Sequence, residues 1–158
     1  EVAEMARWKE WLCCGRRQLT DASLGVYLRD KTGDSMSVEV VWRDEEGKRE
    51  VAFELWRSYY HRLHRAYMVA GHTPALFLTR LFAMVGRYET LSVDKSGYQA
   101  ALPVEVMQIL HEELGVDHEC YASPLNAHLP SFGSAFADLD AFFGSNGSFF
   151  DFEPRAGC

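Results

Sequence analysis

The residues best suited to ligand chemistry lie in one stretch of this sequence, from residue 117 to residue 152. Its first part contains a run able to enter a β-sheet, residues 119–122, which Ser123 and Pro124 follow directly. Because proline cannot donate a hydrogen bond to a sheet, the strand is predicted to end there in a polar loop. Polar loops at strand ends are where α/β proteins commonly bind ligands. The pattern therefore predicts a ligand-binding loop over residues 122–126.

The second part of the stretch repeats this form. Gly144 and Gly147 lie among small polar residues, and Phe149, Phe150 and Asp151 follow them. We predict a second strand at residues 149–152. Glycine lets the backbone approach a ligand closely, and an acid at the end of such a strand suits a pair of ribose hydroxyls. A plain tight turn is the alternative, because Gly, Ser and Asn favour turns.

Three runs in the C-terminal part of the chain resemble the phosphorylated CTD interacting factor 1 family. They are Q-A-A-L-P at residues 99–103, E-C-Y-A-S-P-L-N at residues 119–126, and S-A-F-A-D-L-D-A-F-F-G-S-N-G-S-F-F-D-F at residues 134–152. The resemblance implies an S-adenosylmethionine-dependent methyltransferase that acts on the exocyclic N6 amine of the adenosine next to an mRNA cap. It also implies a location in the nucleus and a helical domain in front of a Rossmann-like catalytic domain.

The resemblance further implies that S-adenosyl-L-methionine binds where the two predicted strands end. In this interpretation Asn126 donates to the methionine carboxylate, and Asp151 accepts from the ribose hydroxyls. The residues expected to contact the cofactor are Ala122, Ser123, Pro124, Leu125, Asn126, Phe143, Gly144, Ser145, Phe149 and Asp151.

The Asn-Pro-Pro-Phe motif of the family, which holds the target adenine, does not occur in the 158 residues. Catalytic residues are therefore left unassigned, and the chain is expected to supply the helical region plus part of the cofactor-binding half. The alternative hypothesis is a catalytically inactive interaction module of a larger ribonucleoprotein or transcription assembly. Asp138 and Asp140 could form an acid pair, yet methyl transfer to an amine needs none, and turn capping is the alternative.

Three arginines are the candidates for RNA binding. Arg57, Arg62 and Arg65 are interleaved with tyrosines along one predicted helix, and arginine pairs with phosphate while tyrosine stacks on bases. The alternative is an ordinary amphipathic helix with a solvated basic face. The net charge of −7 argues against a broad phosphate-binding surface. The implied partner is capped mRNA or another RNA, with the C-terminal tail of RNA polymerase II or a larger assembly as further candidates.

Neither metal binding nor membrane insertion is predicted. The six histidines and four cysteines lack the paired spacing of metal ligands. Adjacent Cys13 and Cys14 cannot readily bridge each other, which favours a reduced intracellular compartment. Cys120 is expected to be a small buried thiol within a strand, with no base to activate it. No apolar run approaches the roughly 20 residues of a membrane-spanning helix.

The elements that position these residues follow from hydrophobic periodicity and capping residues. An amphipathic helix is predicted over residues 1–17. Thr20 or Asp21 is then expected to cap a short helix that holds Leu24, Tyr27 and Leu28.

An antiparallel hairpin is predicted after residue 37. Its strands are joined around Gly47, and the second strand is expected to end near Phe53. The alternative assigns this second run to the helix that follows, because strand alternation is not evident from Glu54 onward.

Three further helices are predicted from caps and apolar spacing. One covers residues 56–69 and ends at Gly71, and the next opens at Thr73 and Pro74 and continues to about Tyr88. The third covers residues 104–114 and is closed by Gly115.

The predicted fold class is mixed, α+β with α/β character. Residues 1–95 are expected to form a helical region with a β-hairpin, and residues 96–158 the N-terminal part of a Rossmann-like methyltransferase sheet. The boundary is placed near Ser96, because a helix followed by a strand is the order expected at the start of such a sheet.

Overall fold

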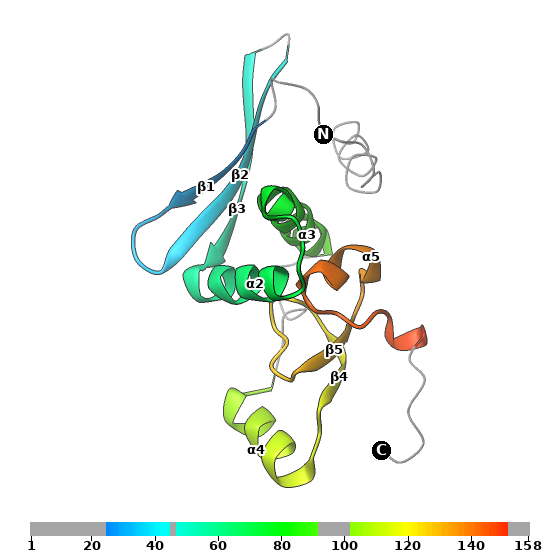
Figure 1. Cartoon of the computed structure of the whole chain (residues 1–158). Helices are drawn as coiled ribbons and strands as arrows, with labels where there is room; N and C mark the ends of the chain where they lie inside the picture. Colours follow the sequence, from blue (N-terminus) through cyan, green and yellow to red (C-terminus); the bar gives the residue numbers. More distant parts are fainter. Residues whose placement is uncertain (1–24, 45–46, 92–101, 152–158) are drawn as a thin grey trace.

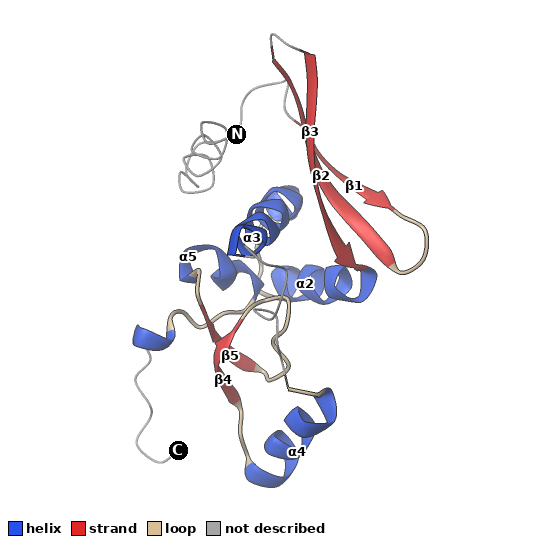
Figure 2. Ribbon diagram, turned by 180° about the vertical axis from the view of Figure 1, so that it is seen from behind, coloured by secondary structure: helices blue, strands red, loops and turns tan. Residues whose placement is uncertain are grey.

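The computed structural model describes residues 25–44, 47–91 and 102–151. These residues form an antiparallel sheet of three strands, a central pair of helices, and a smaller parallel pair of strands (Figures 1 and 2). Two segments with predicted features, the helix over residues 1–17 and the domain boundary near Ser96, lie outside the described residues. The mixed helix and sheet composition agrees with the predicted class, and a Rossmann-like sheet remains a prediction.

The antiparallel sheet has the order β1-β2-β3, with β1 at Gly25–Asp30, β2 at Ser35–Asp44 and β3 at Gly47–Trp56. The predicted hairpin is confirmed, since Asp44 pairs with Gly47 at its turn. β3 nevertheless continues three residues beyond Phe53. Ala52 and Glu54 are exposed while Leu55 is buried, so the two-residue alternation of a strand persists to its end.

β1 replaces the short helix predicted around Tyr27 and Leu28, and that prediction was wrong. Val26 and Leu28 are partly buried against the core, whereas Tyr27 and Arg29 are exposed. A period of two residues therefore decides the local structure, because β2 provides a partner for every residue of this short run.

Two helices follow the sheet, as the sequence predicts. α2 covers Arg57–Val69 and ends just before Gly71, whose φ of +75° favours glycine. A short turn, η1 at Pro74–Leu76, leads into α3 at Phe77–Leu91. Figure 1 shows α2 and α3 between the antiparallel sheet and the parallel strands.

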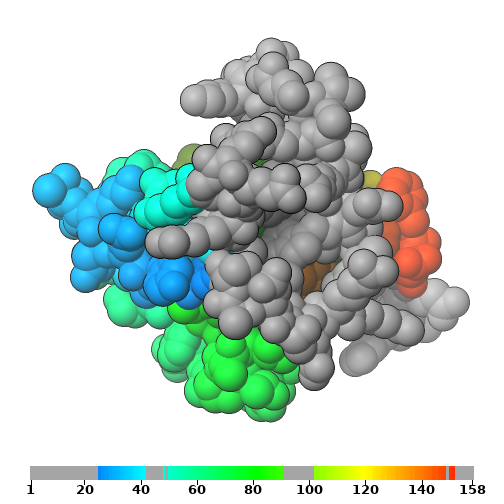
Figure 3. Space-filling model, turned by 90° about the horizontal axis from the view of Figure 1, so that it is seen from above, coloured from blue at the N-terminus to red at the C-terminus, as the bar shows by residue number. Residues whose placement is uncertain are grey.

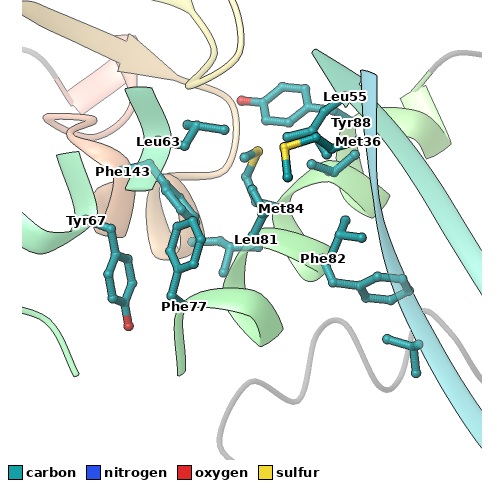
Figure 4. Packing of buried hydrophobic residues seen from close by; sticks show 14 residues of the cluster. Met36, Leu55, Leu63, Tyr67, Phe77, Leu81, Phe82, Met84, Tyr88 and Phe143 are labelled. Atoms are coloured by element: carbon teal, nitrogen blue, oxygen red, sulfur yellow. The ribbon is translucent and has the colours of Figure 1, made fainter. Parts of the chain in front are cut away.

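The buried core joins the sheet to both central helices (Figure 4). Met36 and Leu55 from the sheet, Leu63 from α2 and Leu81 from α3 belong to one buried cluster. Phe143, from the C-terminal segment, belongs to the same cluster. The two regions on either side of residue 96 thus share apolar packing.

The C-terminal region begins with α4 at Val104–Leu114, which ends at Gly115 as predicted; Gly115 has the left-handed conformation. β4 at His118–Ala122 then pairs in parallel with β5 at Ser131–Ser134. After β5 come α5 at Ala137–Asp140, η2 at Ala141–Phe143 and η3 at Phe149–Asp151. Seen from above, η3 in red lies at the edge opposite the blue β1 and β2 (Figure 3).

The strand predicted at residues 149–152 is wrong over its described part. Residues 149–151 form the 3₁₀ turn η3, because Ser148 accepts from the amide of Asp151 at 3.1 Å and its hydroxyl accepts from the amide of Phe150 at 3.2 Å. The partner of β4 is β5 instead. Within the part of the chain that is described, no helix is both long and apolar enough to cross a membrane.

Candidate ligand-binding site

The loop after β4, residues 123–129, is held in shape by its own side chains. Asn126 Oδ1 accepts hydrogen bonds from Ser123 N at 2.7 Å and from Ser123 Oγ at 2.9 Å. The carbonyl of Ser123 in turn accepts from the amides of Asn126 and Ala127. With Oδ1 committed, the amide of Asn126 has a fixed orientation, and its Nδ2 donors have no partner among the described residues.

Arg62 of α2 fixes the same loop from outside. Its Nη1 donates to the carbonyl of Ala127 at 2.8 Å, and its Nη2 donates to the carbonyls of Pro124, at 2.9 Å, and Leu125. The guanidinium also lies 5.2 Å from the centre of the Tyr59 ring. Burial lowers the pKa of Arg62, but a guanidinium remains charged in proteins. A charged donor therefore binds three loop carbonyls at once.

Glu119 of β4 closes the far end of the loop. Its Oε1 accepts from the amides of His128 at 2.6 Å and Leu129 at 2.7 Å. Hydrogen bonds to a carboxylate are roughly twice as strong as neutral ones. The loop is thus fixed at both ends by charged side chains, which is the support that a precise binding loop needs.

The second group of predicted cofactor residues lies beside β5. Ser145 forms a bridge with Phe132, and its Oγ is 2.7 Å from Ser134 Oγ. Ser134 also pairs with Ala122 at the end of β4. Residues 122 and 145 therefore lie on the two sides of Ser134, near the carboxyl ends of parallel strands. Gly144, with a φ of +100°, makes the turn that returns the chain to the sheet.

The remaining predicted residues have different environments. Phe143 is buried in the main core, and the carboxyl-bearing Asp151 is exposed on η3. Arg57 pairs with Asp30 at 3.0 Å, while Arg65 is exposed on α2. Arg62, the third predicted RNA contact, instead donates to backbone carbonyls of the loop.

A buried carboxyl supports the turn that carries Ser145. Asp140 is fully buried, accepts from Tyr88 Oη at 2.6 Å, and its carbonyl accepts from the amide of Ser145. Burial raises the pKa of Asp140, and burial together with this hydrogen bond raises the pKa of Tyr88. Asp138, by contrast, pairs with Arg87 at 2.6 Å, which lowers the pKa of Asp138. Only one of the two acids is therefore a surface group.

A pocket of about 630 Å³ borders the loop. It lies where the β1–β2 turn, the end of β3, α2 and α3 come together, and Leu125 and Asn126 form one side of it. The other eight predicted cofactor residues are not among the described residues that line it. No group of three His, Cys, Asp or Glu suited to a metal ion occurs within the described ranges. Cys120 is exposed, so its predicted burial was wrong.

Sequence reasoning missed four of the residues that build this site. Glu119, Tyr88 and Asp140 were not assigned to it, and Arg62 was assigned to RNA instead. Arg62 donates to carbonyls 62 to 65 residues away, and Tyr88 and Asp140 are bonded to each other across 52 residues. The amides that Glu119 binds are 9 and 10 residues away, and no short motif marks any of the four. The one available signal is the pair of acids at residues 138 and 140, since an acid within an apolar turn region is rarely buried without a partner.

Two curated relatives are similar to this chain, and both are named mRNA (2'-O-methyladenosine-N(6)-)-methyltransferase. The Mus musculus protein is 38% identical over 108 residues, which cover 64% of this chain and 15% of the relative. The Homo sapiens protein is 41% identical over 85 residues, which cover 51% of this chain and 12% of the relative. The matched part of the chain thus covers less than one sixth of the length of either relative.

A family model described as the phosphorylated CTD interacting factor 1 WW domain matches residues 54–158. The match begins within β3 and takes in every described element after it, from α2 to η3. Trp56 is the only tryptophan of the matched range. Because the match covers more than half of its length, this chain belongs to the phosphorylated CTD interacting factor 1 family.

Proposed function

We propose that this chain forms part of an S-adenosyl-L-methionine-dependent methyltransferase that modifies the N6 amine of the adenosine next to an mRNA cap. It contributes the helical region and part of the cofactor-binding half of a Rossmann-like domain, in a nuclear enzyme. The names of both relatives and the family match support this proposal. The structural observation that carries it is the rigid loop of residues 123–129 at the carboxyl end of a parallel strand.

The residues of the loop fit the methionine end of such a cofactor. Asn126 has two Nδ2 donors with no partner in the described structure, and its bonded Oδ1 sets their direction. They are suited to a carboxylate acceptor. Asp151 is an exposed acceptor for ribose hydroxyls, and Gly144 leaves room for backbone approach. The bound cofactor would supply the methyl group on a sulfonium.

Positioning is the main contribution that these residues can make to the reaction. The exocyclic amine of adenosine is a weak nucleophile, because its lone pair is shared with the ring, so the transfer depends on an in-line arrangement of the reacting atoms. Arg62 and Glu119 hold the loop, and the loop would hold the cofactor. No residue of this chain is assigned to contact the target adenine.

Titration calorimetry with S-adenosyl-L-methionine tests the proposal. Asn126→Ala and Asp151→Ala are each expected to weaken binding by about ten- to a hundredfold, because each removes a polar partner worth about 1–3 kcal/mol. Asp117→Ala is the matched control, since this exposed acid precedes β4, at the opposite end of the strand. Unchanged affinity in both site variants, or no binding to the protein at all, would contradict the assignment.

The second candidate is a catalytically inactive interaction module, with the phosphorylated tail of RNA polymerase II or a larger assembly as partner. Exposed apolar side chains favour it: Leu114 at the end of α4 is 69% exposed and Phe150 on η3 is 82% exposed. Such surface is typical of contact sites. Sedimentation velocity discriminates the candidates, because a stable, monodisperse monomer would count against the module.

A further inference from the structure

The pocket beside the loop has an apolar floor and an acidic, aromatic rim. Leu55 and Val85, both buried, lie at its base. Trp56, 57% exposed, and Tyr59, 37% exposed, line it closer to solvent. Three carboxylates, from Asp34, Glu54 and Glu89, complete the rim. The pocket thus combines a surface for hydrocarbon with groups that attract a cation.

The charges of the lining residues all have one sign. Among the described residues that line the pocket there is no Lys, Arg or His. Glu54 lies 3.0 Å from Lys31, and Asp34 lies 3.9 Å from Arg57, so two of the three carboxylates each have a cation beside them. Glu89 is exposed on α3 and has no ion pair within the described residues. Glu89 is therefore the carboxylate of this pocket that is available to attract a cation.

We infer that this pocket binds an arginine side chain of a basic polypeptide segment. The aliphatic stem of arginine can lie on Leu55 and Val85 while its charged head stays at the rim. A guanidinium stacks on an indole, here that of Trp56, and it matches a carboxylate such as Glu89 with two parallel hydrogen bonds. Lysine fits less well, because its ammonium is compact and strongly hydrated.

The pocket is large enough to hold an arginine side chain together with part of its backbone. About 630 Å³ exceeds the volume of a single side chain and lies within the usual range of binding pockets. The net charge of the chain, −7, also favours a basic partner. The inference does not depend on cofactor binding, although Asn126 borders both sites.

Calorimetry with an uncharged-end pentapeptide, acetyl-Gly-Gly-Arg-Gly-Gly-amide, tests this inference. The peptide should bind, and replacement of its arginine by citrulline, which is similar in shape but neutral, should weaken binding by about tenfold or more. Added salt should weaken binding of the arginine peptide but not binding of the citrulline peptide. No detectable binding of the arginine peptide, or equal binding of the citrulline peptide, overturns the inference.

Protein variants locate the binding to this pocket. Glu89→Gln and Trp56→Leu should each weaken binding of the arginine peptide by about fivefold or more. Both residues are exposed, so circular dichroism should show an unchanged fold. Glu113→Gln, an exposed glutamate on α4, is the matched control and should bind normally. Wild-type affinity in Glu89→Gln overturns the inference.

Two further titrations separate this site from other uses of the surface. Glu89→Gln should bind S-adenosyl-L-methionine as the wild type does, so failure of the arginine peptide and failure of the cofactor are distinguishable results. A short oligoribonucleotide should not displace the peptide, because the lining is acidic. Displacement by RNA would show that this surface serves nucleic acid, and the inference would be wrong.

Discussion

Arg62 shows at the residue scale how one side chain can serve structure where its type suggests recognition. An arginine on an amphipathic helix is a reasonable candidate for phosphate, and the sequence offers no means to see its partners. Those partners are carbonyls 62, 63 and 65 residues away along the chain. Once they are satisfied, the guanidinium has few donors left for RNA, so its main effect is to fix the loop.

Removal of this guanidinium should loosen the loop and lower stability. Arg62→Ala leaves three buried or half-buried carbonyls without their donor, with an expected loss of about 1–3 kcal/mol in the free energy of unfolding. Urea unfolding measures the loss, and hydrogen exchange at the amides of residues 126–129 should accelerate. Arg65→Ala, exposed on the same helix, should change stability by less than about 0.5 kcal/mol. Equal effects of the two variants would show that the loop does not depend on Arg62.

The two acids at residues 138 and 140 should have opposite effects on the pH dependence of stability. The pKa of Asp140 is raised above its usual 3.8, so its contribution favours folding at low pH and is lost as pH rises through the folded-state pKa. The pKa of Asp138 is lowered by Arg87, so its contribution is present above pH 3.8 and is lost as pH falls.

Urea unfolding at several pH values checks this pair. Asp140→Asn should reduce the loss of stability that accompanies a rise from about pH 4 to pH 7. Asp138→Asn should instead reduce the loss that accompanies acidification below about pH 4. If both variants shift the pH profile in the same direction, then burial does not raise the pKa of Asp140.

At the scale of elements, predictions succeeded where a local signal ends or begins an element. Gly71 and Gly115 end α2 and α4, and Pro74 opens the segment that leads to α3, because each backbone preference acts without distant partners. β1 was missed, since apolar residues at positions 24, 27 and 28 fit a short helix as well as a strand.

The pairing of the parallel strands could not be predicted from the local sequence. β5 is only four residues long, with glycine at its centre, and it is a strand because β4 and Ser145 lie on either side of it. The aromatic residues at 149 and 150 have strand propensity, yet a turn at Ser148 takes precedence. The candidate site depends on these non-local pairings, so its loop could be predicted and its supports could not.

The extension of β3 to Trp56 can be tested at the same scale. Leu55→Ala should lower the free energy of unfolding by about 2–5 kcal/mol, because the side chain is buried against Met36 and the core. Glu54→Ala, one position earlier and exposed, should have little effect. Thermal or urea unfolding measures both. Comparable losses in the two variants would mean that strand alternation ends before this point.

At the scale of the whole molecule, the shared core bears on the predicted division of the chain near residue 96. Phe143 comes from beyond that point, yet its ring lies 5.9 Å from the Tyr67 ring and 6.4 Å from the Phe77 ring. Tyr88 of α3 similarly bonds Asp140 of α5. These contacts join the helices to the turn beside the candidate site. A destabilising substitution in either region should therefore lower the stability of both.

We expect the chain to unfold in one cooperative transition. Phe143→Ala should lower the urea midpoint of that whole transition. Loss of a buried phenylalanine costs about 3–5 kcal/mol, and here it removes ring contacts with α2 and α3 together. Far-ultraviolet and near-ultraviolet circular dichroism should give the same urea midpoint in the wild type and a lower, still shared midpoint in the variant. Phe150→Ala is the matched control, because this phenylalanine is exposed on η3 and its removal leaves the core intact. Separate midpoints for the two probes, or a Phe143→Ala effect confined to exchange of amides after residue 102, would show that the two regions are stabilised independently.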